Sequence, residues 1–192
     1  MIAFDLFGHG ESQSDFVFGA KEHELYTKIL GDINANEAIT KPIVTVGHSM
    51  GGVPAANVLS ESELVDGAIL LAPMIRFDQA AKLYLSYKSP MLNGVLSNDM
   101  DDIVSKAMAT KNIDPQSTDI SLTIANTRKP VLIVNSDVDT VSPIDKFSNL
   151  KSEFIQQKIF KGRSHPSLIA FDNDDAKFVE SWILDNFPVV SK

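Results

Sequence analysis

The residues "GHSMGG" at positions 47–52 place a serine among glycines between two apolar segments, and this arrangement indicates how the chain folds. The run "KPIVTV" (41–46) precedes them and "VPAANVLS" (53–60) follows, so a buried strand passes through a sharp turn into a helix. Such a turn holds its central residue in a strained backbone conformation and exposes its side chain at the carboxyl edge of a sheet. We therefore expect the hydroxyl of Ser49 to face solvent or a substrate.

Short apolar runs recur along the chain and predict the strands of one sheet. They are "MIAFDL" (1–6), "PIVTV" (42–46), "DGAILLA" (66–72) and "PVLIVN" (130–135), and a less apolar fifth run, "FIQQKIF" (154–160), fits an edge strand. The first four are nearly continuous in apolar residues, which is typical of strands buried on both faces of a parallel sheet. We expect an α/β fold with a mostly parallel sheet of about five strands and flanking helices.

Segments with helical spacing separate these runs. Apolar residues recur every three to four positions in 21–39 and in 174–187. The second segment follows the acidic start "DNDD" (172–175), and carboxylates are favoured at the positive end of a helix. Strands that alternate with helices in this way form right-handed βαβ units, which predicts helices layered against the sheet.

The stretch 74–128 separates two predicted strands by far more residues than one crossover needs. It contains apolar helical runs at 77–88 and 100–110, and "DISLTIANT" (119–127) favours a third helix despite some two-residue alternation. Breaks in the stretch are predicted at Pro90, Gly94 and Pro115.

This insertion divides the chain into a core of residues 1–73 and 129–192 and a helical cap of residues 74–128. Its apolar residues exceed what one helix face can bury, so we expect them to line an acyl pocket. The candidate wall residues are Phe77, Tyr84, Leu85, Met91 and Met108. The alternative is an ordinary helical crossover that decorates the sheet.

Composition excludes several classes of protein. The net charge of −8 leaves no basic stripe to neutralise phosphates, so nucleic acid is not an expected partner. The absence of cysteine excludes disulfides, thiol nucleophiles and cysteine-bound zinc, and the scattered histidines form no zinc motif. No apolar run approaches the ~20 residues of a membrane span, and the opening "MIAFDLF" lacks the basic flank of a signal peptide. We expect a cytoplasmic protein that needs no metal and no cofactor.

A serine hydroxyl is a poor nucleophile until a base removes its proton, so a histidine and a carboxylate should accompany Ser49. The segment "GRSH", just after the last strand-like run, supplies His165. The segment "DVD", just after the run before it, supplies Asp137 or Asp139. Because both segments follow predicted strands, we expect their side chains at the same edge of the sheet as the serine.

The residues around the serine suit the same chemistry. We expect Gly47 and Gly51 because a Cβ atom at either position would collide with neighbouring backbone. The helix that begins at Met50 points its free N–H groups at the place where an oxyanion would form. His48 adjoins the serine and should point away from it, and His9 belongs to a turn, so we interpret both as structural hydrogen-bonding residues.

Further motifs accompany "GHSMGG" along the chain, namely "DLFGHGES" (5–12), "VDGAILLAP" (65–73), "DTVSP" (139–143) and "GRSH" (162–165). Together they resemble the α/β-hydrolase superfamily, nearest its esterase, lipase and lysophospholipase group. The resemblance implies catalytic residues in the order serine, aspartate, histidine, and its acid turn favours Asp139, which lies four residues before the proline.

The resemblance also implies three strands and a His-Gly loop ahead of residues 1–6, so we expect an α/β-hydrolase fold abbreviated at the N-terminus. The chain is then the rear portion of a longer protein, or its sheet closes the gap in an unusual way. Direct pairing of 1–6 with 42–46 would close the gap and carry the turn Phe7–Gly10 to the place of the second oxyanion donor. Otherwise the sheet has an open edge, which a second copy or another part of the molecule would cover.

We expect a serine hydrolase that cleaves a small carboxylic ester through an acyl-enzyme intermediate. In this interpretation Ser49 attacks the carbonyl, His165 carries the proton and Asp139 orients the imidazole, with the Met50 amide at the oxyanion. Two alternatives are a catalytically weak or non-catalytic domain that binds a ligand or partner, and an acyltransferase or perhydrolase with the same three residues.

Overall fold

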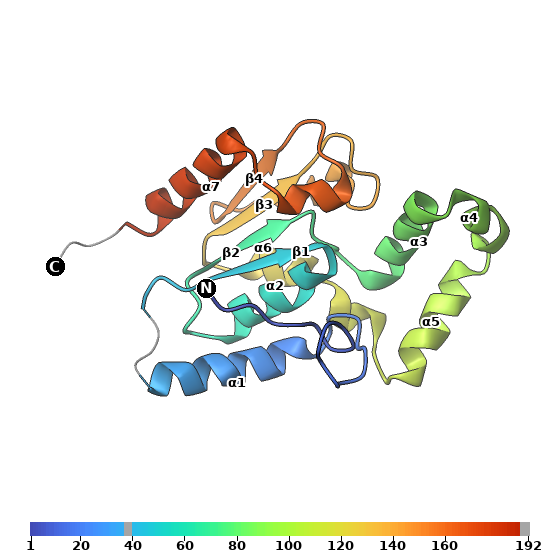
Figure 1. The fold of residues 1–192 in the computed structure, drawn as a ribbon, viewed down its shortest axis with the longest axis horizontal. Coiled ribbons are helices and arrows are strands. Elements are labelled where there is room, and N and C mark those ends of the chain that lie inside the picture. The colour runs from blue at the N-terminus through green and yellow to red at the C-terminus, as the bar shows by residue number, and fades with distance from the viewer. Residues whose placement is uncertain (37–39, 189–192) are drawn as a thin grey trace.

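The computed structural model describes residues 1–36 and 40–188 and contains one parallel sheet. Its strands are β1 (Val44–His48), β2 (Gly67–Leu71), β3 (Val131–Asn135) and β4 (Ile155–Ile159), in the spatial order β1-β2-β3-β4 (Figure 1). All three pairings are parallel, and the less apolar run at 154–160 forms an edge strand as predicted. The mostly parallel α/β fold is therefore confirmed.

The two central strands explain why their sequences are continuously apolar. Every residue of β2 and β3 is buried. Ala68 and Leu70 of β2 face one apolar cluster, whereas Ile69 and Leu71 face another on the opposite side of the sheet. Because successive side chains of a strand point to opposite faces, a strand covered on both faces needs an apolar residue at each position.

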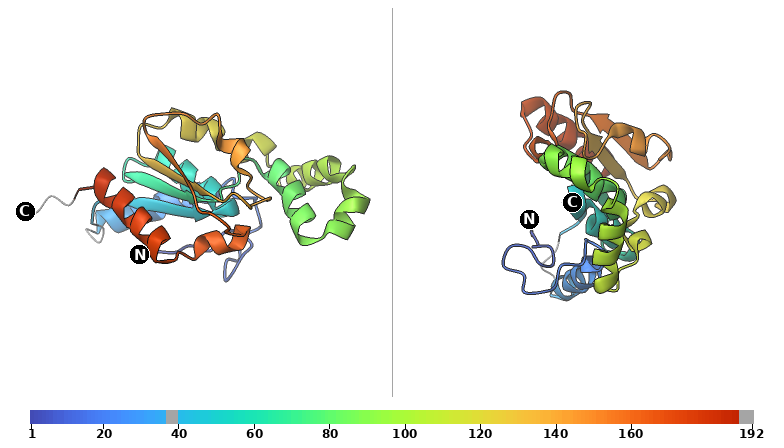
Figure 2. Two further views of the ribbon diagram at one scale, coloured as in Figure 1. Left: turned by 90° about the horizontal axis from the view of Figure 1, so that it is seen from above. Right: turned by 90° about the vertical axis from the view of Figure 1, so that its right-hand side faces the viewer.

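Helices cover both faces of the sheet (Figure 2). On one face lie α2 (Gly52–Glu61) and α6 (Ser121–Asn126), and α1 (Glu22–Ala35) packs against α2. On the other face lies α7 (Asn173–Asn186), whose Trp182 is buried against the sheet. These elements confirm the helices predicted at 21–39, 119–127 and 174–187, although residues 37–39 lie outside the described residues.

The acidic start of α7 acts as predicted. The carboxylate of Asp172 accepts hydrogen bonds from the backbone N–H groups of Asp174 and Asp175 and so caps the helix.

Among the described residues, no helix is long and apolar enough to cross a membrane.

The insertion between β2 and β3 forms a group of helices beyond the carboxyl ends of the strands (Figures 1 and 2). It contains α3 (Phe77–Lys88), α4 (Pro90–Leu96), α5 (Met100–Thr110) and a 3₁₀ turn at Pro115–Thr118, followed by α6. The break predicted at Gly94 is wrong, because α4 continues through this residue. The helices predicted at 77–88 and 100–110 are confirmed, and so is the break at Pro90, because α3 ends at Lys88 and a new helix starts at the proline. Proline is tolerated there because it occupies the first turn of the helix, where its missing N–H has no partner to lose.

The N-terminal segment is not the strand that its sequence predicts. Residues 1–6 form no ladder, and among the described residues β1 pairs with β2 alone, so direct pairing of 1–6 with 42–46 is wrong. The sheet accordingly has four strands, not five. The segment is held by α1 instead: the ring of Phe4 stacks on Tyr26 at 4.5 Å, and the Tyr26 hydroxyl donates to the carbonyl of Asp5 at 2.9 Å.

This anchor keeps its proton over the whole physiological range. Burial, with smaller contributions from the carboxylates of Glu22 and Asp5, raises the pKa of Tyr26 to about 12. The hydroxyl therefore remains a donor to the Asp5 carbonyl and holds the N-terminal segment on α1, although Met1, Ile2 and Phe4 stay exposed.

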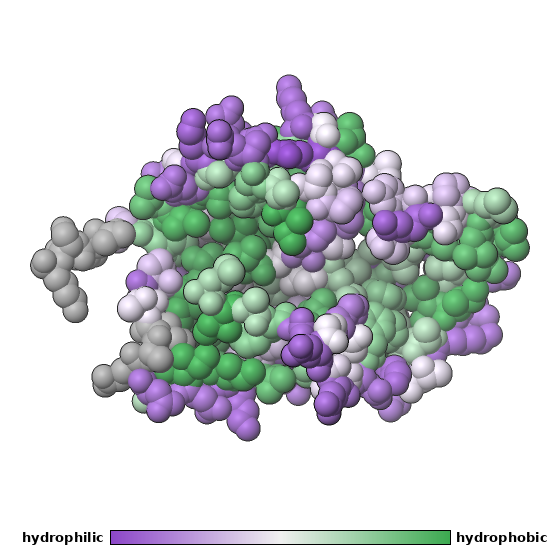
Figure 3. Space-filling model, in the orientation of Figure 1, coloured by the Kyte–Doolittle hydropathy of each residue, from purple (hydrophilic) through white to green (hydrophobic). Residues whose placement is uncertain are grey.

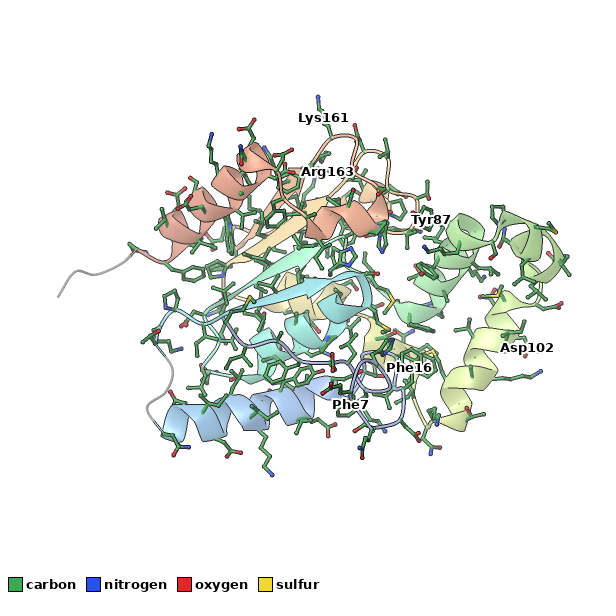
Figure 4. The ribbon with its side chains drawn as sticks, in the orientation of Figure 1. Phe7, Phe16, Tyr87, Asp102, Lys161 and Arg163 are labelled. Atoms are coloured by element: carbon green, nitrogen blue, oxygen red, sulfur yellow. The ribbon has the colours of Figure 1, made fainter. Side chains whose placement is uncertain are left out.

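An aromatic cluster joins the N-terminal loop to the inserted helices. The rings of Phe16 and Phe18 lie 4.5 Å apart, and the ring of Phe18 lies 4.6 Å from that of Phe77 at the start of α3. Figure 4 shows Phe7 and Phe16 on this loop, and both pack against the same apolar cluster as α5. The loop after residues 1–6 therefore supports the inserted helices rather than the sheet.

Candidate active site

The turn after β1 holds Ser49 in a conformation that side chains rarely adopt. The φ angle of Ser49 is +52°, in the left-handed region, and the residue begins a short 3₁₀ turn (Ser49–Gly51) that leads into α2. Such a conformation costs about 1–3 kcal/mol and persists only where the surroundings fix it. Here the backbone N–H of Met74, just after β2, donates to the carbonyl of Ser49 at 3.0 Å.

Close packing explains two of the three glycines around the serine. A Cβ atom at Gly47 would lie 2.3 Å from the carbonyl oxygen of Gly51, so the predicted collision is confirmed there. At Gly51 the prediction is wrong, because no atom lies within 4 Å of the added carbon and the backbone is in the ordinary right-handed region. The collision occurs instead at Gly52, whose added carbon would meet Pro73 at 2.8 Å.

The structure brings Ser49, His165 and Asp139 together. His165 Nε2 lies 2.8 Å from Ser49 Oγ, and His165 Nδ1 lies 2.8 Å from Asp139 Oδ2. The three residues follow β1, β4 and β3, and parallel strands bring their carboxyl ends to one edge of the sheet. His165 and Asp139 are both buried.

The surroundings of Asp139 keep its carboxylate charged and fix the proton on the histidine. Burial alone would raise the pKa of Asp139, but hydrogen bonds from His165 and from the backbone N–H groups of Val141 and Ser142 outweigh it and lower the pKa. An ionised carboxylate requires a proton on His165 Nδ1, which leaves Nε2 as an acceptor facing the Ser49 hydroxyl.

The other candidate acid, Asp137, has a different role. Its exposed carboxylate accepts a hydrogen bond from the backbone N–H of Gly162 at 2.7 Å, and the Ser136 hydroxyl accepts one from the N–H of Arg163 at 3.1 Å. Arg163, seen on this loop in Figure 4, also pairs with Asp172 and Asp175 at the start of α7. Asp137 therefore fastens the loop that carries the histidine and does not bond to the imidazole.

Sequence reasoning missed a buried polar network beside the acid. The Ser142 hydroxyl donates to the carbonyl of Pro73 at 2.8 Å, and the Asn135 amide donates to the carbonyl and hydroxyl of Ser142 at 3.2 Å. All of these groups are buried. The only sequence signal was the run of polar residues directly after an apolar strand, where burial is unusual unless each group has a partner.

Both histidines that sequence assigned to structural roles make backbone hydrogen bonds. His48 Nε2 lies 2.9 Å from the carbonyl oxygen of His165, and His9 Nδ1 lies 3.1 Å from that of Phe7.

The five predicted wall residues do not surround one cavity. Phe77, Leu85 and Met108 belong to the apolar cluster under α3 and α5, where Met108 is fully buried. Tyr84 and Met91 are 48% and 87% exposed. A hollow of about 20 Å³ between the start of α3 and the loop that follows Asp139 has room for about one water molecule and is too small for an acyl chain.

In the described residues, no group of three or more histidine, aspartate or glutamate side chains could hold a metal ion.

Comparison with known families gives one match. A family model described as serine aminopeptidase, S33 matches residues 1–118, more than half of the chain. No curated protein matches the sequence.

Solved structures of similar fold span nearly the whole chain. An esterase of Pyrococcus furiosus has a TM-score of 0.73 and 18% sequence identity, covering 96% of this chain and 70% of its own. A thermophilic esterase of the planctomycete Thermogutta terrifontis has a TM-score of 0.63 and 14% identity, covering 94% of this chain and 70% of its own. The N-acyl homoserine lactonase AidH, complexed with N-butanoyl homoserine, has a TM-score of 0.61 and 14% identity, covering 98% of this chain and 80% of its own. At these identities the likeness concerns the fold.

The packing around the serine predicts opposite effects for two neighbouring glycines. Gly47→Ala should lower the free energy of unfolding by about 3 kcal/mol, because the colliding atom is a backbone oxygen that cannot move aside. Gly51→Ala has open space and a right-handed backbone, so its stability should stay within about 0.5 kcal/mol of the wild type. Urea unfolding of both variants measures the difference, and equal losses would contradict this account of the turn.

Proposed function

The chain belongs to the serine aminopeptidase S33 family of α/β hydrolases, and we propose that it is a serine hydrolase that cleaves carboxylic esters. The observation that carries this proposal is the continuous hydrogen-bonded path from Ser49 through His165 to Asp139. A hydroxyl, an imidazole and a carboxylate in this order form the arrangement that activates serine as a nucleophile. The esterases of similar fold support the choice of substrate class.

In the proposed reaction Ser49 Oγ attacks the ester carbonyl while its proton passes to His165 Nε2. The tetrahedral intermediate collapses when the imidazolium donates that proton to the leaving alkoxy oxygen. The ester C–O bond then breaks, the alcohol departs, and the acyl group remains bonded to Ser49 Oγ as the acyl-enzyme. His165 then takes a proton from a water molecule, whose oxygen attacks the acyl carbon. The imidazolium returns this proton to Ser49 Oγ as the bond between Oγ and the acyl carbon breaks, which releases the carboxylic acid and restores the free enzyme. The charge of Asp139 stabilises the imidazolium in both steps.

The oxyanion needs hydrogen-bond donors near the nucleophile. We assign this role to the backbone N–H of Met50, because it follows Ser49 at the start of the 3₁₀ turn that leads into α2. The positive end of the helix adds to the stabilisation of the developing charge.

We also propose that residues 74–128 act as a cap. The support is the position of α3, α4 and α5 beyond the carboxyl ends of the strands, the edge at which Ser49 and His165 lie (Figures 1 and 2). Phe77 and Leu85 are only half-buried in the cluster under α3, so they are the wall residues best placed to contact an acyl chain. The remaining candidates, Tyr84, Met91 and Met108, would contribute only if α3–α5 moved.

The open side of the sheet supports a proposal about assembly: a second copy covers the edge at β1. Val46 is 62% exposed on this edge strand, and Met1, Ile2 and Phe4 of the N-terminal segment are exposed as well. Figure 3 shows apolar surface gathered over the region where β1 and the N-terminal segment lie in Figure 1. An exposed apolar strand edge is a template for pairing with another chain.

The proposed triad predicts a sharp contrast between the two aspartates. Ser49→Ala, His165→Ala and Asp139→Asn should each lower kcat/KM for p-nitrophenyl esters by about 10³-fold or more. Asp137→Asn should lower it less than about tenfold, because the asparagine oxygen can still accept the N–H of Gly162.

A fluorophosphonate probe separates the alternatives, because it labels only an activated serine. Labelling of the wild type but not of Ser49→Ala supports the serine hydrolase, and no labelling of either indicates a non-catalytic domain. If the wild type is labelled but forms product only when an alcohol or hydrogen peroxide is present to accept the acyl group, the activity is acyl transfer or perhydrolysis.

For the two aspartates, a larger loss of kcat/KM in Asp137→Asn than in Asp139→Asn would contradict the assignment of Asp139 as the acid.

The cap predicts a change in chain-length preference. Replacing residues 89–98 with a short glycine–serine linker removes α4, and it should lower the ratio of kcat/KM for octanoate over butyrate esters by about tenfold. Met91→Ser is the matched control, because this side chain already faces solvent and its loss should leave the ratio unchanged. An unchanged ratio in the shortened variant would reduce the insertion to a decoration of the sheet.

The open edge predicts a dimer whose contact lies at β1. Light scattering should give the wild type twice its mass of 21.0 kDa, and Val46→Lys should give a monomer because it places a charge on the pairing edge. Ile159→Lys changes an exposed apolar residue on the opposite edge strand and should leave the dimer intact. A monomeric wild type, or a dimer lost only in Ile159→Lys, would contradict the proposal.

A further inference from the structure

One residue before the nucleophile, a second histidine reaches the histidine of the site. His48 ends β1, and its Nε2 donates a hydrogen bond to the backbone carbonyl of His165 at 2.9 Å. The two rings lie 5.1 Å apart between centroids, tilted by 41°, so they are neighbours without stacking. Two adjacent residues at the end of β1 therefore contact His165. Ser49 is hydrogen-bonded to its imidazole, and His48 is hydrogen-bonded to its backbone carbonyl.

We propose that His48 is a positioning residue that holds the backbone of His165 so that the imidazole stays within reach of Ser49. Its effect on turnover rests on the proposed esterase function. The loop ahead of His165 is fixed at Gly162 by Asp137 and at Arg163 by the Ser136 hydroxyl. His48 adds an anchor at His165 itself, which starts a short 3₁₀ turn (His165–Ile169).

The position of the imidazole depends on this anchor because the histidine side chain is short. Its two nitrogens are bonded to Asp139 and Ser49, so a shift of the backbone disturbs the geometry of both hydrogen bonds. Displacements of the order of 1 Å in reacting groups can cost turnover about 10²-fold. The hydrogen bond from His48 to the His165 carbonyl opposes such a shift, and it comes from β1, the strand that also positions Ser49.

The charge state of His48 suits this position. Burial lowers the pKa of His48, and nearby His165 lowers it further, although the carbonyl hydrogen bond and the charge of Asp139 act in the opposite direction. His48 therefore stays neutral to lower pH than an ordinary histidine. A neutral ring keeps its Nε2–H donor and places no second positive charge beside the imidazolium that His165 becomes during turnover.

Two substitutions separate the donor from the bulk of the side chain. In glutamine the amide nitrogen is as many bonds from the backbone as His48 Nε2, so His48→Gln can keep the bond to the His165 carbonyl. His48→Leu keeps similar volume and has no donor. His23→Gln on α1 is the matched control, because it changes a histidine that contacts Glu61 and lies outside the site.

The expected result is a loss confined to the variant without a donor. His48→Leu should lower kcat by about tenfold with KM unchanged, whereas His48→Gln and His23→Gln should keep kcat within about twofold of the wild type. Thermal unfolding of all variants identifies any general loss of stability. Full activity in His48→Leu, or equal losses in His48→Leu and His48→Gln at equal stability, would overturn the role of the donor.

A second measurement keeps this inference separate from the proposed function. Nitrogen NMR of the labelled protein without substrate follows the imidazole of His165, whose two nitrogens are bonded to Asp139 and Ser49 and whose backbone carbonyl is bonded to His48. His48→Leu should change the nitrogen chemical shifts of His165, because the hydrogen bonds of its imidazole lengthen or realign, whereas His48→Gln should keep the wild-type chemical shifts. If the wild type hydrolyses no ester and takes no fluorophosphonate label, the proposed function fails, and this NMR contrast alone decides the positioning role. Unchanged His165 signals in His48→Leu would overturn it.

Discussion

The strained backbone of Ser49 is the constraint to which the surrounding structure is fitted. Its φ of +52° is tolerated because three close contacts fix the turn. Gly47 packs against the carbonyl of Gly51, Gly52 packs against Pro73, and the backbone N–H of Met74 donates to the carbonyl of Ser49. Two of these contacts come from the end of β2, the strand next to β1. The position of the nucleophile therefore depends on the register of a strand pair as well as on its own turn.

Polar contacts extend this fixation to the acid. Ser142 bonds the carbonyl of Pro73 and, through its N–H, the carboxylate of Asp139, while the next residue along from Pro73 bonds the carbonyl of Ser49. One short stretch after β2 thus holds the nucleophile on one side and the acid loop on the other. Because these groups are buried, loss of any one leaves a polar partner unsatisfied, which typically costs about 1–3 kcal/mol.

Sequence predicted what depends on local pattern and failed where distant partners decide. The strands β1 to β4, the turn at Ser49 and the carbonyl clash at Gly47 all follow from patterns within a few residues. Residues 1–6 have an equally apolar pattern but no strand beside them, and Phe4 packs on Tyr26 instead. The buried Ser142 was missed because its partner, the carbonyl of Pro73, comes from a distant part of the chain. Asp139, by contrast, was favoured over Asp137 only through the family's acid turn, and its contact with His165 comes from another strand end.

The two residues that share the 2.8 Å contact at the centre of the site are 116 positions apart, and His165 follows β4, an edge strand. A site within one hairpin needs only local contacts, but this one has high contact order and exists only when β1, β2, β3 and β4 are all paired in one sheet. Edge elements also open most readily in local unfolding. Reaction of Ser49 with a fluorophosphonate would therefore indicate that the whole sheet is folded. Local unfolding of β4 would separate His165 from Ser49 and abolish this reaction while the central strands stay intact.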